Sequence, residues 1–174
     1  EYRLLLRQDN ADERLTRLGY NLGLASQKRV KILNEKIKKS NALMNFIKKE
    51  SVDPKEINNT LERKNSSLLK QKVKINTLLA RPHINIKDLR AIKSLDKYLK
   101  TNLLDTNQIE KVEIEIKYGG YLNKEKKSVE KFEKFEKMKL SAEFEYDKLH
   151  SISTEGREKL NTIKPKTIGQ ASRI

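Results

Sequence analysis

Apolar residues in this chain recur at the spacing of an α-helix. The clearest run follows Ser26, where the apolar positions are Val30, Leu33, Ile37, Met44 and Ile47. Because a helical turn takes 3.6 residues, these positions form one apolar stripe that suits a single partner helix. The 174 residues include only six glycines, three prolines and 6% aromatic residues, too few for a turn-dense β-sandwich or barrel. We therefore expect an all-α fold.

The first 110 residues are predicted to form a helical bundle that contains a long basic helical hairpin. The helix that follows Ser26 must end before Asp53-Pro54, because proline disfavours helical backbone in the residue that precedes it. A less regular apolar pattern over residues 61–79 predicts a return helix. The two helices together give a hairpin over about residues 26–80.

Capping patterns predict other helix boundaries in this part of the chain. Residues 1–7 are interpreted as helical, and Asn10 with Glu13 has the pattern of a capping box that opens a second helix. Asn85 with Asp88 resembles the cap of a further, short helix.

Residues 111–174 are predicted to form a long helix and a truncated small C-terminal helical subdomain. The run 112–118 alternates like a β-strand, but its apolar residues also share one helix face. A lone strand would have no partner, so we interpret the run as helix. A capping box at Asn107 and Glu110 would open this helix, and Gly119-Gly120 would weaken or kink it.

The C-terminal residues predict the start of another helix. Thr167 and Gln170 form a capping-box pattern, so a helix should begin at Ile168. The chain ends soon afterwards, and we expect it to be a fragment of a longer protein.

Positive charge is concentrated in two stretches. The formal net charge is +15, and residues 28–50 and 61–90 contribute +6 each, which favours acidic partners. Two interpretations stay open: the hairpin lysines provide a non-specific electrostatic field, or they form a solvated face. These lysines include Lys36, Lys38, Lys39, Lys70, Lys72 and Lys74.

The residues that many enzymes need are missing or scattered. The chain has no cysteine, and His83 and His150 lie far apart, so neither a thiolate nor a zinc-binding motif is present. No glycine-rich phosphate loop or nucleophile elbow occurs. No apolar run approaches the roughly 20 residues that cross a bilayer, and the N-terminus lacks a signal-peptide pattern. We expect no metal, no membrane contact, a cytoplasmic location and no catalysis by this fragment alone.

Three separated blocks carry a family resemblance. They are EYRLLLRQDNAD at residues 1–12, continued at 14–16, VEIEIKY at 112–118, continued to Tyr121, and KPKTIGQASRI at 164–174. In order and spacing they resemble the C-terminal helical domain of the glucose-inhibited division protein A (MnmG/GidA) family of tRNA-modifying enzymes.

The resemblance implies a role in tRNA modification. In such enzymes an N-terminal portion binds FAD and NADH, and the protein, expected to be a homodimer, works with a GTPase of the MnmE/TrmE family on the wobble uridine of tRNA. The flavin-binding glycine-rich motif is absent from this chain, so no cofactor is expected to bind here. The family pattern is also broken at Glu13, which is usually apolar, at Gly119, usually an acid, and at Ser151, usually glycine.

The three blocks contain the candidate tRNA-binding residues. Cations suit phosphate and exposed aromatic rings suit stacking on bases. The candidates are Arg3, Arg7, Arg14, Lys117, Tyr118, Tyr121, Lys166 and Arg173. Alternatives remain for several of them, because nearby acids offer the arginines internal ion pairs and both tyrosines are candidates for burial. Lys166 also precedes a helix start that suits an anion.

The function expected from the sequence is therefore that of a tRNA- and partner-binding domain of a flavin-dependent enzyme. That enzyme would install the carboxymethylaminomethyl group on the wobble uridine. The alternative is a structural interaction domain that docks the partner GTPase without itself contacting tRNA.

Overall fold

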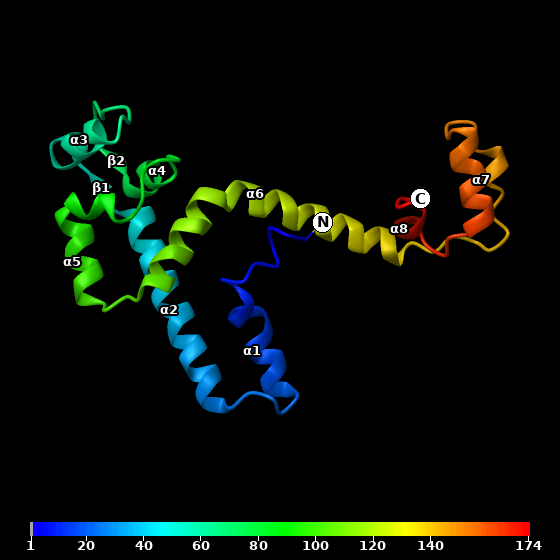
Figure 1. Cartoon of the computed structure of the whole chain (residues 1–174), viewed down its shortest axis with the longest axis horizontal. Helices are drawn as coiled ribbons and strands as arrows, with labels where there is room; N and C mark the ends of the chain where they lie inside the picture. Colours follow the sequence, from blue (N-terminus) through cyan, green and yellow to red (C-terminus); the bar gives the residue numbers. More distant parts are fainter. Residues whose placement is uncertain (1) are drawn as a thin grey trace. The chain divides into compact units, whose positions relative to one another are not determined.

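The computed structural model describes residues 2–174, and the chain divides into two compact units, Arg3–Leu122 and Asn123–Ile174. Helices predominate in both units (Figure 1), and the only paired strands among the described residues are two residues long. The elements are α1 (Ala11–Asn21), α2 (Gln27–Lys49), β1 (Ser51–Val52), α3 (Pro54–Arg63), β2 (Val73–Lys74), α4 (Ile75–Leu79), η1 (Asp88–Ala91), α5 (Lys93–Thr101), α6 (Thr106–Lys137), η2 (Tyr146–Lys148), α7 (Thr154–Ile163) and α8 (Ile168–Ala171). The all-α prediction is confirmed.

One apolar core holds the first unit together. Side chains from α2 through α6 meet in it, and most of them are fully excluded from solvent. Its largest members are Leu43, Ile47, Ile57, Leu61, Ile75, Leu78, Leu79, Ile84, Ile86, Leu89, Ile92 and Leu95. Because one core joins these elements, the short segments between α2 and α6 are fixed by packing rather than by their own helix propensity.

The predicted hairpin has only one long helix. Ser26 caps α2 by accepting a hydrogen bond from the Arg29 amide at 3.3 Å, but residues 61–79 form the end of α3, a loop, β2 and α4. Asn58 explains the loop, since its side chain accepts from the Leu69 amide at 2.9 Å and donates to the Leu69 carbonyl at 3.0 Å. This long-range contact, together with the antiparallel β1–β2 pair, replaces the predicted return helix.

The prediction of helix at residues 1–7 is wrong for the described residues, 2–7, which form turns; Glu1 lies outside them. The Asn10 side chain does not cap α1. It donates to the Leu5 carbonyl at 2.8 Å and accepts from Arg14 Nε at 2.9 Å. Asn10 thus fixes the preceding turns instead of satisfying the free amides of the helix.

The long helix α6 includes the strand-like run 112–118, so the helical interpretation is confirmed. Its start is capped two residues earlier than predicted. The Asp105 carboxylate accepts from the Gln108 amide at 2.7 Å, and the Gln108 side chain accepts from the Asp105 amide at 3.0 Å. The Asp105–Gln108 pair and the predicted Asn107–Glu110 pair both fit the capping-box pattern. Only Asp105 lies directly before Thr106, the first residue of α6.

The expected short helix after Asn85 is divided in two. The Asp88 carboxylate accepts from the Asn85 amide at 3.0 Å, as the cap pattern suggested, but the helix that follows is the 3₁₀ turn η1. Ile92 then adopts extended backbone, with φ −74° and ψ 110°, before α5 begins. Its side chain is fully buried in the core, so the break accompanies the burial of Ile92.

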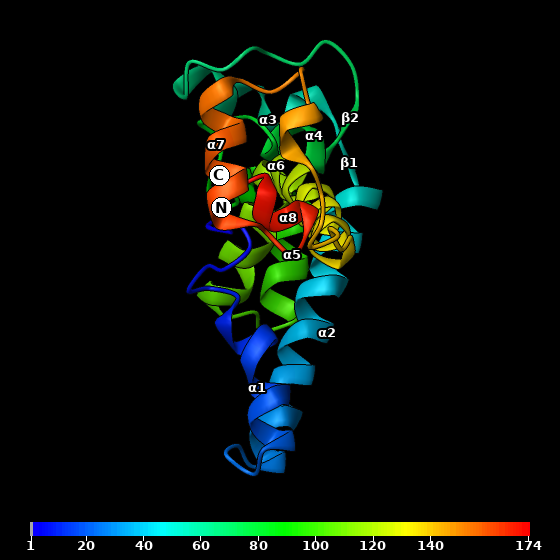
Figure 2. The same cartoon turned by 90° about the vertical axis from the view of Figure 1, so that its right-hand side faces the viewer.

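The helix pair α1 and α2 lies side by side in two perpendicular views (Figures 1 and 2). A second contact fixes α1 to α6. Lys111 on α6 is only 7% exposed, and its ammonium group pairs with Glu13 of α1 and, at 3.7 Å, with Glu115. A buried ammonium group is stable only while an acceptor faces it.

The second unit is closed by backbone pairing near its C-terminus. The Leu140 amide donates to the Lys166 carbonyl and the Ile168 amide to the Met138 carbonyl, each at 2.9 Å. These bonds bring α8 against the end of α6. A Cβ atom added to Gly169 would lie 2.6 Å from the Glu136 carboxyl carbon and 3.0 Å from its backbone nitrogen, so this approach needs glycine.

No helix in the described range 2–174 is both long and apolar enough to cross a membrane. The same residues contain no group of three or more His, Asp or Glu side chains placed to hold a metal ion.

We predict that Glu13→Ala will lower the free energy of unfolding of the first unit by about 1–3 kcal/mol, because it leaves Lys111 buried with only the more distant Glu115. Urea unfolding followed by circular dichroism measures this change. The double variant Glu13→Leu/Lys111→Met should recover most of the loss, since apolar side chains can replace such a pair. An unchanged unfolding midpoint in Glu13→Ala would show that Lys111 does not depend on Glu13.

A second prediction concerns Gly169→Ala, which should destabilise the second unit by about 1–3 kcal/mol through overpacking against Glu136. Hydrogen exchange of the Leu140 and Ile168 amides reports on this unit directly. Gly120→Ala is the matched control: a Cβ there meets nothing within 4 Å, so it should be neutral or stabilising by up to about 1 kcal/mol. Equal exchange rates in the two variants would contradict the packing argument.

Candidate nucleic-acid interface

Most of the arginines nominated from the sequence have internal partners. Arg7 forms a two-pronged pair with Asp9, with both N···O distances 2.9 Å, and also donates to the Leu4 carbonyl at 3.2 Å. Hydrogen bonding to Arg7 holds the pKa of Asp9 below its ordinary value. Arg14 donates to Asn10 at 2.9 Å. Arg7 therefore has the internal ion pair considered as an alternative, whereas the partner of Arg14 is an uncharged amide.

In the second unit, Arg173 pairs with Glu136. Hydrogen bonding from Arg173 is the main cause that lowers the pKa of Glu136. Thr167 caps α8 by accepting from the Gln170 amide at 3.1 Å, and Gln170 accepts from the Lys166 amide at 2.8 Å. The Ile168 amide likewise donates to the Met138 carbonyl. Three amides at the expected anion site beside Lys166 therefore already have acceptors, and α8 itself has only four residues.

Four of the nominated residues face solvent or a cavity. Arg3 and Lys166 are exposed, and neither side chain forms a hydrogen bond or ion pair within the part of the chain that the structure describes. Tyr118 and Tyr121 are 49% and 66% exposed, so the alternative of buried tyrosines is excluded. The two rings lie three residues apart on α6, which places them on neighbouring positions of its surface.

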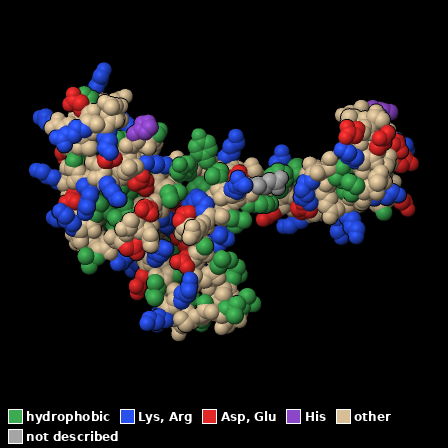
Figure 3. Space-filling view, viewed as in Figure 1, with side chains coloured by type: hydrophobic (Ala, Val, Ile, Leu, Met, Phe, Trp, Pro, Cys, Tyr) green, Lys and Arg blue, Asp and Glu red, His purple; other side chains and the backbone are tan. Residues whose placement is uncertain are grey.

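A group of lysines gathers where β1 and β2 pair. We call Lys48, Lys49, Lys70, Lys72 and Lys74 the β-edge lysines. Antiparallel pairing of Ser51 with Lys74 brings the end of α2 beside the segment that enters β2, and Lys74 donates to the Lys49 carbonyl. Figure 3 shows Lys and Arg side chains spread over this lobe, which contains α3, β1, β2 and α5 in Figure 1. Apart from Lys74, the β-edge lysines have no hydrogen-bonded or ionic side-chain partner within residues 2–174.

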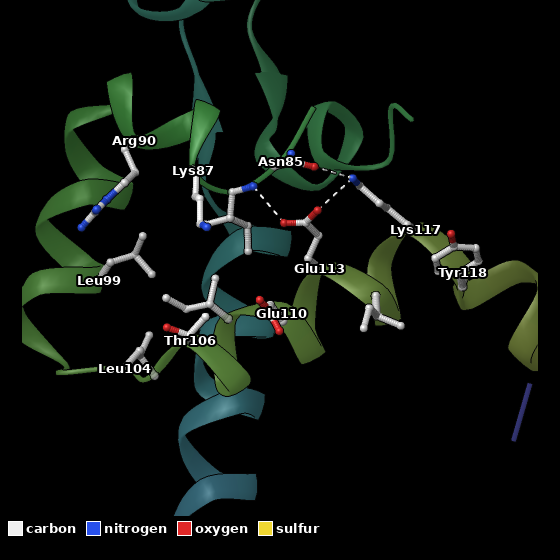
Figure 4. A pocket seen from close by; sticks show the side chains of 13 residues that line it. Asn85, Lys87, Arg90, Leu99, Leu104, Thr106, Glu110, Glu113, Lys117 and Tyr118 are labelled. Carbon is white, nitrogen blue, oxygen red and sulfur yellow. Dashed lines mark hydrogen bonds and ion pairs between the residues drawn. The ribbon is translucent and has the colours of Figure 1, made fainter. Parts of the chain in front are cut away.

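A cavity of about 620 Å³ lies between α5, the loop over residues 80–87 and α6 (Figure 4). Glu113 of α6 forms one wall: one carboxylate oxygen accepts from the Ile86 amide at 3.0 Å and the other from Lys117 Nζ at 2.9 Å. Lys117 also donates to the Asn85 side chain at 3.0 Å. Lys117, which was nominated as a phosphate ligand, thus helps to form the wall of the cavity. Tyr118 lines the same cavity beside Lys117.

Sequence reasoning missed three other charged residues of this cavity, Lys87, Arg90 and Glu110, and the uncharged Thr106. Arg90 donates to Asp96 at 3.1 Å. Glu110 was interpreted as the capping partner of Asn107, and Lys87 was one cation among many in a basic stretch. No local signal could have found them, because the fold brings them together from separate elements.

Comparison with known families identifies the chain. Residues 27–126 match the family described as the tRNA modifying enzyme MnmG/GidA C-terminal helical domain, and residues 128–174 match the MnmG/GidA C-terminal helical bundle. The chain belongs to the MnmG/GidA family. The two matched regions meet within a few residues of the boundary between the compact units, after Leu122, whereas the sequence analysis divided the chain at residue 110.

Individual MnmG/GidA relatives agree along the whole chain. It is 45% identical over 174 residues to the tRNA uridine 5-carboxymethylaminomethyl modification enzyme MnmG of Christiangramia forsetii, covering 100% of this chain and 28% of that protein. The MnmG of Karelsulcia muelleri is 42% identical, with 100% and 26% covered. The structure of Aquifex aeolicus GidA in its form II crystal is 32% identical, with a TM-score of 0.61, over 99% of this chain and 26% of that one. The chain therefore spans about a quarter of the length of these relatives.

One apolar surface of this MnmG/GidA chain also has no described partner. Leu15, Leu18 and Leu22, which give α1 its helical pattern, are 54%, 58% and 74% exposed, and Leu24 beyond α1 is 83% exposed. The residue of α1 that is buried is Thr16. A cluster of exposed leucines is a common feature of interaction surfaces.

We predict that the Arg7–Asp9 pair is lost in acid. Because the folded-state pKa of Asp9 is lowered from 3.8, the pair stabilises the fold fully above about that pH and loses its effect as pH falls through the lowered value. The NMR signal of Arg7 Nε–H should be protected from solvent exchange at neutral pH and lose this protection in strong acid. Asp9→Asn should remove the protection at every pH, with Arg3 as the unpaired control. A signal that is indifferent to both changes would contradict the pairing.

Proposed function

We propose that this chain is the tRNA- and partner-binding domain of an enzyme that installs the carboxymethylaminomethyl group on the wobble uridine of tRNA. The family membership and the names of its relatives support this assignment. In the proposed enzyme, FAD and NADH bind a portion of the protein outside this chain, and catalysis belongs to that longer protein. It acts in the cytoplasm as a homodimer with a GTPase of the MnmE/TrmE family.

The observation that carries the tRNA-binding proposal is the lack of acidic partners for the β-edge lysines. Four of the five have no described side-chain partner, although the same unit pairs many of its other cations. An RNA backbone supplies phosphates at regular spacing, and lysines on an exposed edge can neutralise several of them. Folded RNA is recognised largely through such contacts and through shape.

The nominated residues then take two kinds of role. Arg3 and Lys166, whose side chains are exposed, are proposed to contact phosphate, and Tyr118 and Tyr121 to stack on unpaired bases. We propose that Arg7, Arg14, Lys117 and Arg173 act mainly by positioning, because each of them already holds a neighbouring segment.

The second candidate function is GTPase docking without tRNA contact. The exposed leucines at Leu15, Leu18, Leu22 and Leu24 favour it, since a protein partner would remove them from water. In this alternative the lysines serve solubility, and their removal would leave tRNA affinity unaffected.

The test compares two variants that each remove two positive charges. Lys70→Gln/Lys72→Gln changes the β-edge, and Lys124→Gln/Lys127→Gln changes an exposed stretch of α6 in the second unit. We expect only the first to weaken tRNA binding, with the slope of log affinity against log salt reduced by about 0.7–0.9 for each phosphate that the protein no longer neutralises. Fluorescence anisotropy at two salt concentrations measures both quantities.

An unrelated duplex RNA serves as the second ligand. A preference for wobble-uridine tRNA that survives the higher salt supports recognition by shape and specific contacts. Two results would contradict the proposal: equal weakening of tRNA binding in the two variants, or equal affinities for the two RNAs that both fall sharply as salt rises. Either result would mean that the positive charge attracts RNA non-specifically, and GTPase docking would then be the function.

A further inference from the structure

Two solvent-exposed residues of opposite charge type, Lys87 and Glu110, line the cavity between α5 and α6 without an internal partner. Lys87 projects into it from the loop and Glu110 from α6, on opposite sides (Figure 4). Neither side chain forms a hydrogen bond or ion pair with any other described residue. The other charged groups are committed: both oxygens of Glu113 are used, Lys117 has two acceptors and Arg90 pairs with Asp96.

The remaining lining is mostly apolar, with Asn85 and Thr106 as its uncharged polar members. Leu99, Leu104 and Ile109 form the apolar part, and Leu99 is only 6% exposed. The volume of about 620 Å³ falls in the range of sites for small organic ligands and nucleotides. Because Glu113 is held at both carboxylate oxygens, its wall is rigid before any ligand arrives, which reduces the entropy lost on binding.

These features specify the chemistry of a ligand. Lys87 suits a phosphate group, and the apolar lining suits the flat faces of a base. Glu110, when ionised, only accepts hydrogen bonds and has two oxygens to do so. Among the four RNA bases, guanine alone presents two adjacent N–H donors, N1–H and the N2 amino group, on its Watson–Crick edge.

We propose that this cavity binds one guanine nucleotide that is extruded from the RNA ligand. Glu110 accepts from the guanine edge, Lys87 holds the phosphate, and the base packs against the apolar lining that Leu99, Leu104 and Ile109 provide. This inference rests on the proposed RNA-binding function. It adds a base-specific site to the β-edge lysines, which recognise RNA only through its charge and shape. Specific readout of RNA by proteins generally uses such unstacked bases.

The test measures binding to the 174-residue chain by calorimetry and by NMR, with guanosine 5′-monophosphate, adenosine 5′-monophosphate and guanosine as probes. The guanine nucleotide should bind at least about tenfold more tightly than the adenine nucleotide, as expected for a pair of hydrogen bonds to a charged group. Glu110→Gln should abolish this preference. Lys87→Ala should weaken binding of the nucleotide but leave guanosine unaffected. Lys97→Ala, an exposed lysine of α5 outside the cavity, is the matched control.

A second arm uses oligouridine with a single central guanosine, compared with the same oligomer carrying adenosine. Tighter binding of the guanosine oligomer that disappears in Glu110→Gln supports the proposal. Equal affinities of the two mononucleotides, or cavity variants that behave like Lys97→Ala, overturn it. Mononucleotide binding without any oligomer preference also overturns the RNA assignment and makes a free nucleotide the ligand.

These outcomes separate the two proposals. If cavity variants keep full tRNA affinity while Lys70→Gln/Lys72→Gln loses it, the cavity proposal fails and the proposed function stands. If the unmodified chain binds neither tRNA nor oligomers, the proposed function fails and the nucleotide arm alone decides what the cavity binds.

Discussion

The charged residues of α6 position the elements that surround the apolar core of the first unit. Glu113 holds the loop before η1 through the Ile86 amide and, at the same time, holds Lys117 one turn away. Lys111, two residues before Glu113 and on a different face of α6, reaches α1 through Glu13. Such bonds are strong when the groups are partly or fully buried, because an unpaired charge there is costly. The loop, α1 and the wall of the cavity are therefore all fixed by charges along one stretch of one helix.

This pairing also explains why a strand-like sequence is helical. The run 112–118 alternates because charged and apolar residues take turns, and alternation by itself favours a strand. In the helix, Glu113 pairs with Lys117 and Lys111 with Glu115, each four residues apart, which is the spacing that brings side chains together on a helix surface. The all-α class, α2 and the cap at Thr167 could likewise be predicted, since each rests on contacts within a few residues.

What the sequence could not reveal rests on distant contacts. Asn58 bonds to Leu69 across eleven positions and breaks the expected return helix. The cations of the family blocks were recognised, but a residue type does not show whether a guanidinium already has an acceptor, as Arg7 has in Asp9. Lys87 and Glu110 line one cavity only because the core positions their separate elements. The exposure of Tyr118 and Tyr121 likewise depends on how α6 packs in the folded chain, which the sequence does not show.

The glycine pair in α6 affects how the chain unfolds. Gly119 and Gly120 have no packing contact that requires them, and each costs helix stability of about 1 kcal/mol relative to alanine. They stand just before the boundary between the two compact units, after Leu122. Helical order has its weakest point there, so melting of one unit need not propagate to the other. The chain should therefore behave as two cooperative blocks, and a single melting temperature would average two separate transitions.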